Sequence, residues 1–203
     1  MKQKLIYLFS VMLMCIFGTN GALADAVTYA LSEGDTFTSG QTVEVKDASN
    51  NVVATITYGE SGGADFGSAT ANTSIAGFTA FTGGNGTNGN KTGGTFYTIV
   101  PKYAGTIEVA VVLNAGKAFH ISEDGTDMAD YNGITVDEKY IGTYSVPVKA
   151  GSSYKVWCDG SKLGFYGFKL TPITKYTTVY NLATAMVAYD AANTKNIEGF
   201  ADV

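Results

Sequence analysis

The stretch that decides the fold is residues 106–113, TIEVAVVL, near the middle of the chain. Its apolar side chains Ile107, Val109, Val111 and Leu113 occupy every second position, which is the period of a β-strand with one buried face. We therefore expect these four side chains to point into a core and Glu108 to point away from it.

The same alternation recurs on both sides of this stretch in short runs that are separated by turn residues. Many short strands without crossover helices are typical of an antiparallel sandwich. The sequence therefore predicts an all-β chain, an antiparallel β-sandwich or jelly roll, over residues 25–172. The predicted strands are 26–31, 42–45, 52–58, 78–81, 95–100, 106–113, 118–122, 140–148, 153–158 and 165–171.

In two of these strands, alternation also predicts which side chains face away from the core. Alternation buries Phe119 and Ile121 and turns His120 outward. It also turns Pro147 outward on the strand at residues 140–148. Because proline has no backbone N–H to give to a ladder, this strand should lie at a sheet edge or carry a bulge.

The two ends of the chain have a different composition. Residues 1–24 begin with Lys2 and Lys4, continue with an apolar run over 5–17, and end in small residues at Ala22 and Ala24. This pattern predicts a secretory signal peptide, and hence a secreted, periplasmic or cell-surface protein with no membrane insertion after cleavage. Residues 173–203 are expected to form a tail that is helical or a linker.

Composition excludes several classes of function. All 13 basic residues are lysines, and the net charge is −5. Removal of residues 1–24 makes it −7, because two lysines and no acid are lost. An acidic chain without arginine opposes nucleic-acid binding. His120 is the one histidine, which leaves few mechanisms of acid–base or nucleophilic catalysis, so we do not expect an enzyme.

The densest acidic stretch carries Glu123, Asp124, Asp127 and Asp130 around Gly125. Oxygen-rich loops of this kind can bind Ca²⁺, although the spacing of an EF-hand is absent. A solvated acidic turn is the simpler interpretation. No cofactor is required by the sequence, and calcium is the one cation that it suggests.

Residues 153–171 suggest a binding surface. Two predicted strands flank the turn-rich link DGSKL at 159–163, so we expect a hairpin. In the register that buries most apolar side chains, Trp157 and Phe165 face outward together. Lysines border them on both strands and on the turn, namely Lys155, Lys162 and Lys169.

An outward aromatic pair can hold the apolar face of a sugar ring, while lysines orient it or meet a uronate carboxylate. The alternative is that other parts of the chain cover Trp157 and Phe165 and that the lysines only protect a sheet from aggregation. Tyr131 and Tyr140 are further candidate ligand contacts, with Tyr97 and Tyr103 behind them, although tyrosines of this kind more often belong to the core or its rim.

The stretch at residues 92–171 resembles the non-catalytic sandwich modules, similar to carbohydrate-binding modules, of secreted pectate-lyase-type and other polysaccharide-degrading proteins of gut bacteria. The motifs that carry the resemblance are GGTFY at 93–97, PKYAGT at 101–106, GTY at 142–144, VKAG at 148–151 and SKLGFYGF at 161–168. The resemblance implies attachment to plant or host glycans, often beside a catalytic domain or partner enzyme.

The sequence thus predicts a secreted, non-catalytic carbohydrate-binding module for plant cell-wall or related polysaccharides, pectin among them. A net charge of −7 would repel a polyuronate unless the lysines form a positive strip or Ca²⁺ bridges the two anions, so neutral glycans stay equally open. The alternatives are an adhesive or structural surface domain that binds protein and, less favoured, a fragment of a polysaccharide lyase or hydrolase.

Overall fold

The computed structural model describes residues 25–36, 38–59, 68–83, 89–90 and 93–173. The predicted signal peptide at 1–24 and nearly all of the predicted tail lie outside the described residues. The described part of the chain contains strands and turns but no helix, and hence no helix long and apolar enough to cross a membrane.

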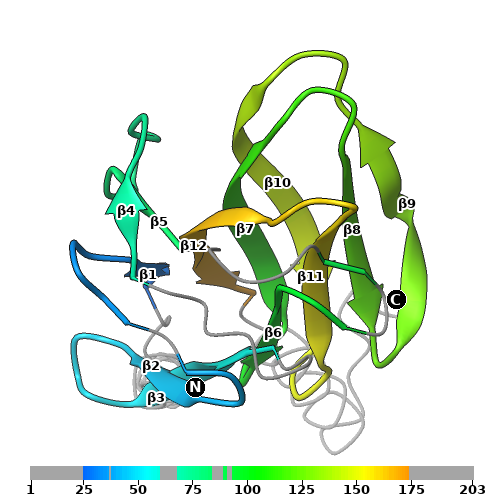
Figure 1. The fold of residues 1–203 in the computed structure, drawn as a ribbon. Coiled ribbons are helices and arrows are strands. Elements are labelled where there is room, and N and C mark those ends of the chain that lie inside the picture. Colours follow the sequence, from blue (N-terminus) through cyan, green and yellow to red (C-terminus); the bar gives the residue numbers. More distant parts are fainter. Residues whose placement is uncertain (1–24, 37, 60–67, 84–88, 91–92, 174–203) are drawn as a thin grey trace, which may run out of the picture. The chain divides into compact units, whose positions relative to one another are not determined.

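Figure 1 labels the strands in their order along the chain. Their bounds are β1 Val27–Ala30, β2 Thr42–Lys46, β3 Val52–Tyr58, β4 Thr70–Ala71, β5 Phe81–Thr82, β6 Phe96–Pro101, β7 Gly105–Leu113, β8 Ala118–Glu123, β9 Thr126–Thr135, β10 Tyr140–Val148, β11 Tyr154–Asp159 and β12 Gly164–Pro172.

Two antiparallel sheets form the body of the fold. One has four strands in the order β1-β12-β7-β10, and the other has six in the order β2-β3-β6-β11-β8-β9. The short hairpin of β4 and β5 joins the first sheet through a bridge between Gly83 and Phe165. The predicted antiparallel β-sandwich is thereby confirmed.

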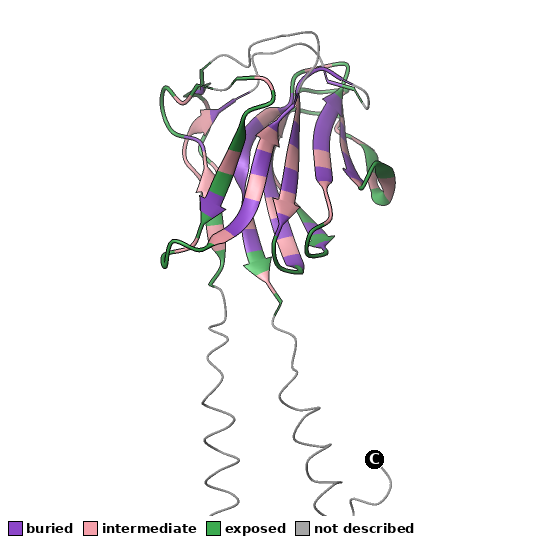
Figure 2. Cartoon of the chain, turned by 90° about the horizontal axis from the view of Figure 1, so that it is seen from below, coloured by how far each residue is buried: buried purple, intermediate pink, exposed green. Residues whose placement is uncertain are grey.

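The core lies between the two sheets and is filled from alternate positions of their strands. Ile107, Val109, Val111 and Leu113 of β7 are buried as predicted, and Glu108 lies outside the core. Bands of buried and less buried residues alternate along most strands (Figure 2). At about 25 cal/mol per Å² of apolar surface, this burial is the main stabilisation of a chain whose described cysteine, Cys158, is unpaired.

The prediction for Pro147 is also confirmed. Strand β10 is an edge strand of the four-stranded sheet, and Pro147 is exposed on it, which is a position where a residue without a backbone N–H is tolerated.

Two sequence predictions are wrong. The acidic stretch from Glu123 to Asp130 was expected to lie in a loop that ends at Asn132 and Gly133. Instead Glu123 ends β8, residues 126–135 form β9, and only Asp124 and Gly125 make the turn between these strands. The expected hairpin over 153–171 does not form, because β11 pairs with β6 and β8 while β12 pairs with β1 and β7. The link at 160–163 therefore passes from one sheet to the other.

Candidate functional site

Trp157 and Phe165 do not form the predicted outward platform. Phe165 points between the sheets, is fully buried, and stacks on Tyr97 with ring centroids 4.1 Å apart. Trp157 lies on the outer face of the six-stranded sheet, since its neighbours Val156 and Cys158 belong to the core, and it is only 1% exposed. The two rings are in different sheets and on opposite sides of the six-stranded one, so the prediction of an exposed pair is wrong.

Neighbouring side chains on the outer face pack around Trp157. The ring of His120 stacks on the indole with centroids 5.1 Å apart and planes 7° from parallel. Phe96 is its cross-strand neighbour on β6. The ammonium of Lys155 lies 3.8 Å from the centroid of the Phe96 ring, and burial lowers the pKa of that lysine. Lys155 is therefore directed at an aromatic ring of its own chain.

The remaining predicted contacts on and near β12 and β10 are dispersed. Lys169 pairs with Glu108 at 3.4 Å on the four-stranded sheet, and Lys162 is exposed on the link between β11 and β12. Tyr140 is half-buried against Tyr144, and its hydroxyl donates to the carbonyl of Thr143 at 2.9 Å. The three predicted lysines thus lie on different parts of the fold and form no common strip.

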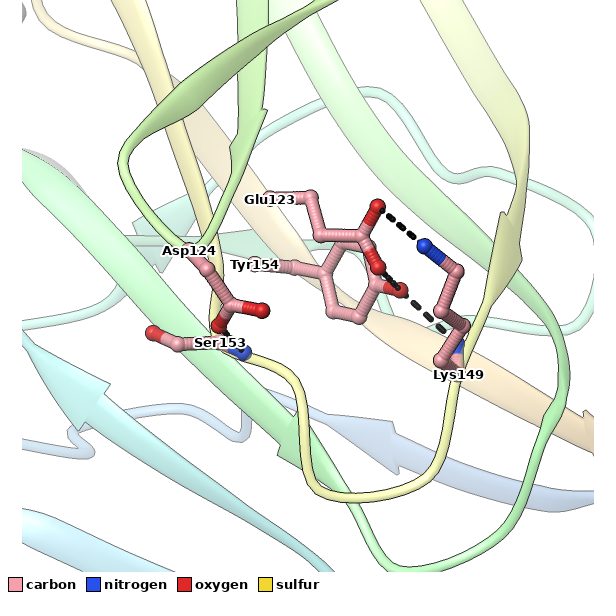
Figure 3. A network of polar contacts seen from close by, with 5 residues as sticks. All are labelled: Glu123, Asp124, Lys149, Ser153 and Tyr154. Carbon is pink, nitrogen blue, oxygen red and sulfur yellow. Dashed lines mark hydrogen bonds and ion pairs between the residues drawn. The ribbon is translucent and has the colours of Figure 1, made fainter.

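Glu123 and Asp124, both predicted calcium ligands, make hydrogen bonds to other groups of the chain (Figure 3). The Tyr154 hydroxyl donates to Glu123 at 2.8 Å, and the Lys149 ammonium contacts the other carboxylate oxygen at 3.0 Å. These contacts, that of Tyr154 first, hold the pKa of Glu123 below its usual value.

Asp124 is used in a similar way. It adopts a positive φ of 48° in the turn and accepts a bond from the backbone N–H of Ser153 at 2.8 Å, which lowers its pKa. Among the described residues no three acidic, histidine or cysteine side chains are arranged to hold a metal ion. Calcium binding by Glu123, Asp124, Asp127 and Asp130 stays a prediction, but their arrangement does not supply the ligand shell.

A surface hollow lies along β9, where the six-stranded sheet ends. Its volume is about 300 Å³, at the lower end of the range of about 300–1,000 Å³ for small-ligand sites. It is lined by Glu123, Thr126, Asp127, Met128, Ala129, Asp130, Tyr131 and Pro147. Four residues that the sequence analysis singled out for two different reasons, the three acids and Tyr131, therefore share one site.

Tyr131 holds the two edge strands together at this hollow. Its hydroxyl donates to the backbone carbonyl of Ser145 on β10 at 2.7 Å, so β9 of one sheet is tied to β10 of the other. The ring is half-buried, and this hydrogen bond fixes its orientation. A rigid aromatic ring at the rim of a hollow suits the apolar face of a ligand.

The sequence analysis missed Met128 and Pro147, which make the apolar part of the lining. Nothing in the local pattern of residues 126–131 identifies them, because their proximity depends on two edge strands from different sheets. The exposed position predicted for Pro147 was the one available signal.

The polar part of the lining is acidic. Three carboxylates and no lysine are among the described residues that line the hollow, and Lys149 reaches Glu123 from the adjoining loop. Carboxylate oxygens accept hydrogen bonds from hydroxyl groups, whereas they repel a uronate. The lining therefore suits an uncharged, hydroxyl-rich ligand that presents one apolar face.

No protein-family model matches this chain, and no curated protein matches it either.

Proposed function

We propose that this chain is a carbohydrate-binding β-sandwich that holds one sugar unit of a neutral polysaccharide in the hollow beside β9, without cleaving it. The observation that carries the proposal is the lining of the hollow, where the fixed ring of Tyr131 stands beside carboxylates that can accept hydroxyl protons. The likeness of residues 92–171 to accessory modules of polysaccharide-degrading proteins supports it.

The proposal modifies the ligand expected from the sequence. A uronate would bring a second negative charge to Asp127 and Asp130, and no lysine in the lining would offset it. We therefore propose neutral plant or host glycans in place of pectin, for a protein exported through the signal peptide at 1–24 and acting beside a partner enzyme.

Affinity electrophoresis in gels that contain neutral or uronate polysaccharides tests this proposal. A neutral glycan should retard the protein, and Tyr131→Ala should weaken binding about five- to tenfold, since an aromatic contact contributes about 1 kcal/mol or more. Tyr103→Ala is the matched control, because Tyr103 is an exposed tyrosine, 42% accessible, that does not line the hollow. Retardation by no glycan, or an equal effect of both substitutions, would overturn the proposal.

A second assay addresses catalysis. Incubation of the protein with a glycan that it binds should release neither reducing ends nor unsaturated products, and release would contradict a purely binding role.

The adhesive alternative has one structural feature in its favour. Strands β9 and β10 are both edge strands, and the unpaired backbone groups of such strands can accept an extended peptide. A protein ligand whose binding is unchanged by Tyr131→Ala, together with no glycan retardation, would favour that function over ours.

A further inference from the structure

The one histidine of the chain is stacked on its one tryptophan, and both of its ring nitrogens face oxygen acceptors. Nδ1 of His120 lies 2.6 Å from Oδ1 of Asn132, and Nε2 lies 3.2 Å from a carboxylate oxygen of Asp159. His120 is on β8, Asn132 is on β9 and Asp159 is on β11, so the ring contacts both strands that flank its own.

The ring stands where the β8–β9 ladder is irregular. The register between these strands shifts on both sides of His120, between Phe119 and His120 and again between His120 and Ser122. Backbone pairing alone holds an edge strand weakly at such a point. The side-chain contact between His120 and Asn132 is therefore an important link between β9 and the rest of the sheet.

The number of protons on the ring decides how many of these links can form. A neutral imidazole has one N–H, so it can donate to Asn132 or to Asp159 but not to both. An imidazolium donates from Nδ1 to Asn132 and brings its positive charge, at Nε2, within 3.2 Å of the Asp159 carboxylate. This second contact is an ion pair without the geometry of a hydrogen bond, and the ring lies on the indole face. When the neutral ring carries its proton on Nε2, the Asn132 amide has to turn over and present its NH₂ group to Nδ1, which gives this contact two distinct arrangements.

Other charged groups are near this ring. Lys155 of β11 lies with its ammonium 5.7 Å from the Trp157 ring, and Lys117, at the start of β8, bonds the carbonyl of Gly160 beside Asp159. Asp127 of β9 pairs across from Ser122. The two lysines oppose a charge on the histidine and the two aspartates favour it, and Asp159 is in direct contact with the ring.

We propose that protonation of His120 holds β9 in place. The charged ring contacts both Asn132 of β9 and Asp159 of β11, and we call this pair of contacts the clasp. Six consecutive residues of β9, Thr126 to Tyr131, line the hollow, and Asn132 follows them directly. Resting on the proposed function, we further infer that protonation of His120 strengthens sugar binding there, and that binding weakens as the pH rises.

Emission of the full-length protein tests the clasp directly, because its only indole belongs to Trp157. A stacked imidazolium quenches indole emission, so the intensity should rise as the pH is raised and the ring loses its proton. In His120→Gln the profile should be flat.

Two substitutions that should move the midpoint of the emission change in opposite directions distinguish the clasp from a histidine that only lies at the surface. Asp159→Asn removes the negative charge of a half-exposed partner and should move the midpoint of the emission change to lower pH. Asn132→Asp adds a carboxylate at Nδ1 and should raise the midpoint. A flat profile in the unsubstituted protein, or midpoints that do not move in these directions, would overturn the clasp.

Glycan binding at the two ends of the pH range in which the emission changes tests the link to the hollow. Binding to the neutral glycan should be tighter at the acidic end, and the difference should vanish in His120→Gln. If the emission rises with pH as expected but the glycan affinity is equal at both ends of the pH range, the effect of His120 on sugar binding is refuted and the clasp itself is not. Absence of binding at every pH would refute the proposed function, and the emission profile would still decide the clasp.

Discussion

Replacement of Trp157 by alanine should destabilise the fold strongly, even though this side chain is on the outer face of a sheet. The indole is 1% exposed and buries about 150–250 Å², which at about 25 cal/mol per Å² corresponds to about 4–6 kcal/mol. Buried Trp→Ala changes cost about 3–5 kcal/mol. Since domains of this size are stable by about 5–15 kcal/mol, the variant should retain only part of its stability.

Trp157→Phe is the informative partner of that substitution. It keeps a ring against His120 and removes an indole N–H that is buried with no acceptor in the described part of the chain. Loss of apolar area is then partly offset by removal of an unsatisfied donor, so the change should stay within about 1.5 kcal/mol.

Urea unfolding followed by far-UV circular dichroism measures both variants, because neither retains the fluorophore. Lys162→Ala, at an exposed position on the link between the sheets, should change the free energy of unfolding by less than about 0.5 kcal/mol and serves as the control. A loss of less than about 1 kcal/mol in Trp157→Ala, or an equal loss in Trp157→Phe, would refute the reasoning. If the expected losses are found, Trp157→Ala cannot be used to map glycan binding, because it would report unfolding.

Three further predictions concern acid stability, backbone packing and calcium. Hydrogen bonds from Tyr154 and then Lys149 hold the pKa of Glu123 in the folded protein below its usual value of 4.5. The ionised carboxylate therefore contributes its full stabilisation of the fold above pH 4.5, and this contribution is lost as the pH falls through the lowered pKa. Glu123→Gln should therefore flatten the loss of stability between about pH 5 and 3 in urea titrations, and an unchanged slope would contradict this. Gly167 has a φ of 135°, and a β-carbon there would lie 2.0 Å from the Tyr29 carbonyl oxygen. Gly167→Ala should therefore lower the free energy of unfolding by about 2–4 kcal/mol in urea titrations. The control Gly116→Ala, at a position where no atom lies within 4 Å of the added carbon, should lower it by about 1 kcal/mol. EDTA should leave the Tm unchanged, because Glu123 and Asp124 already bond protein groups; a clear fall in Tm would restore calcium as a structural ion.

The strands and their inner faces could be predicted because alternation is a local property. The bounds predicted for 52–58 and 140–148 are those of β3 and β10, and the outward positions of His120 and Pro147 follow from the same period. Side-chain direction depends only on neighbours along the strand, so one sequence contains that information.

Assignment of strands to sheets could not be predicted in the same way. The link at 160–163 is short enough for a hairpin, but a link of that length can also reach the facing sheet about 10 Å away. The choice depends on which distant strands β11 and β12 meet, and those are β6 and β8 for one and β1 and β7 for the other. Long-range pairing of this kind leaves no mark in residues 153–171.

Strand β9 was missed for a different physical reason. Its partly buried apolar residues Met128, Tyr131 and Ile134 are spaced by three, not two. Register irregularities in its pairing with β8 insert extra residues and shift the phase of alternation. With aspartates and glycine between these residues, the stretch has the composition of a loop, and its candidate site residues could be named but not placed together.

The position of the hollow follows from the way in which the sandwich ends. Between the sheets, apolar side chains exclude water, but at the lateral boundary the bond from the Tyr131 hydroxyl to the Ser145 carbonyl joins β9 to β10. Closing the gap with Met128 and Pro147 would also take the exposed carboxylate of Asp130 out of water, which costs several kcal/mol for a charge without a new partner. The hollow therefore stays open, and a ligand that occupies it should bring hydroxyl groups that replace water at that carboxylate.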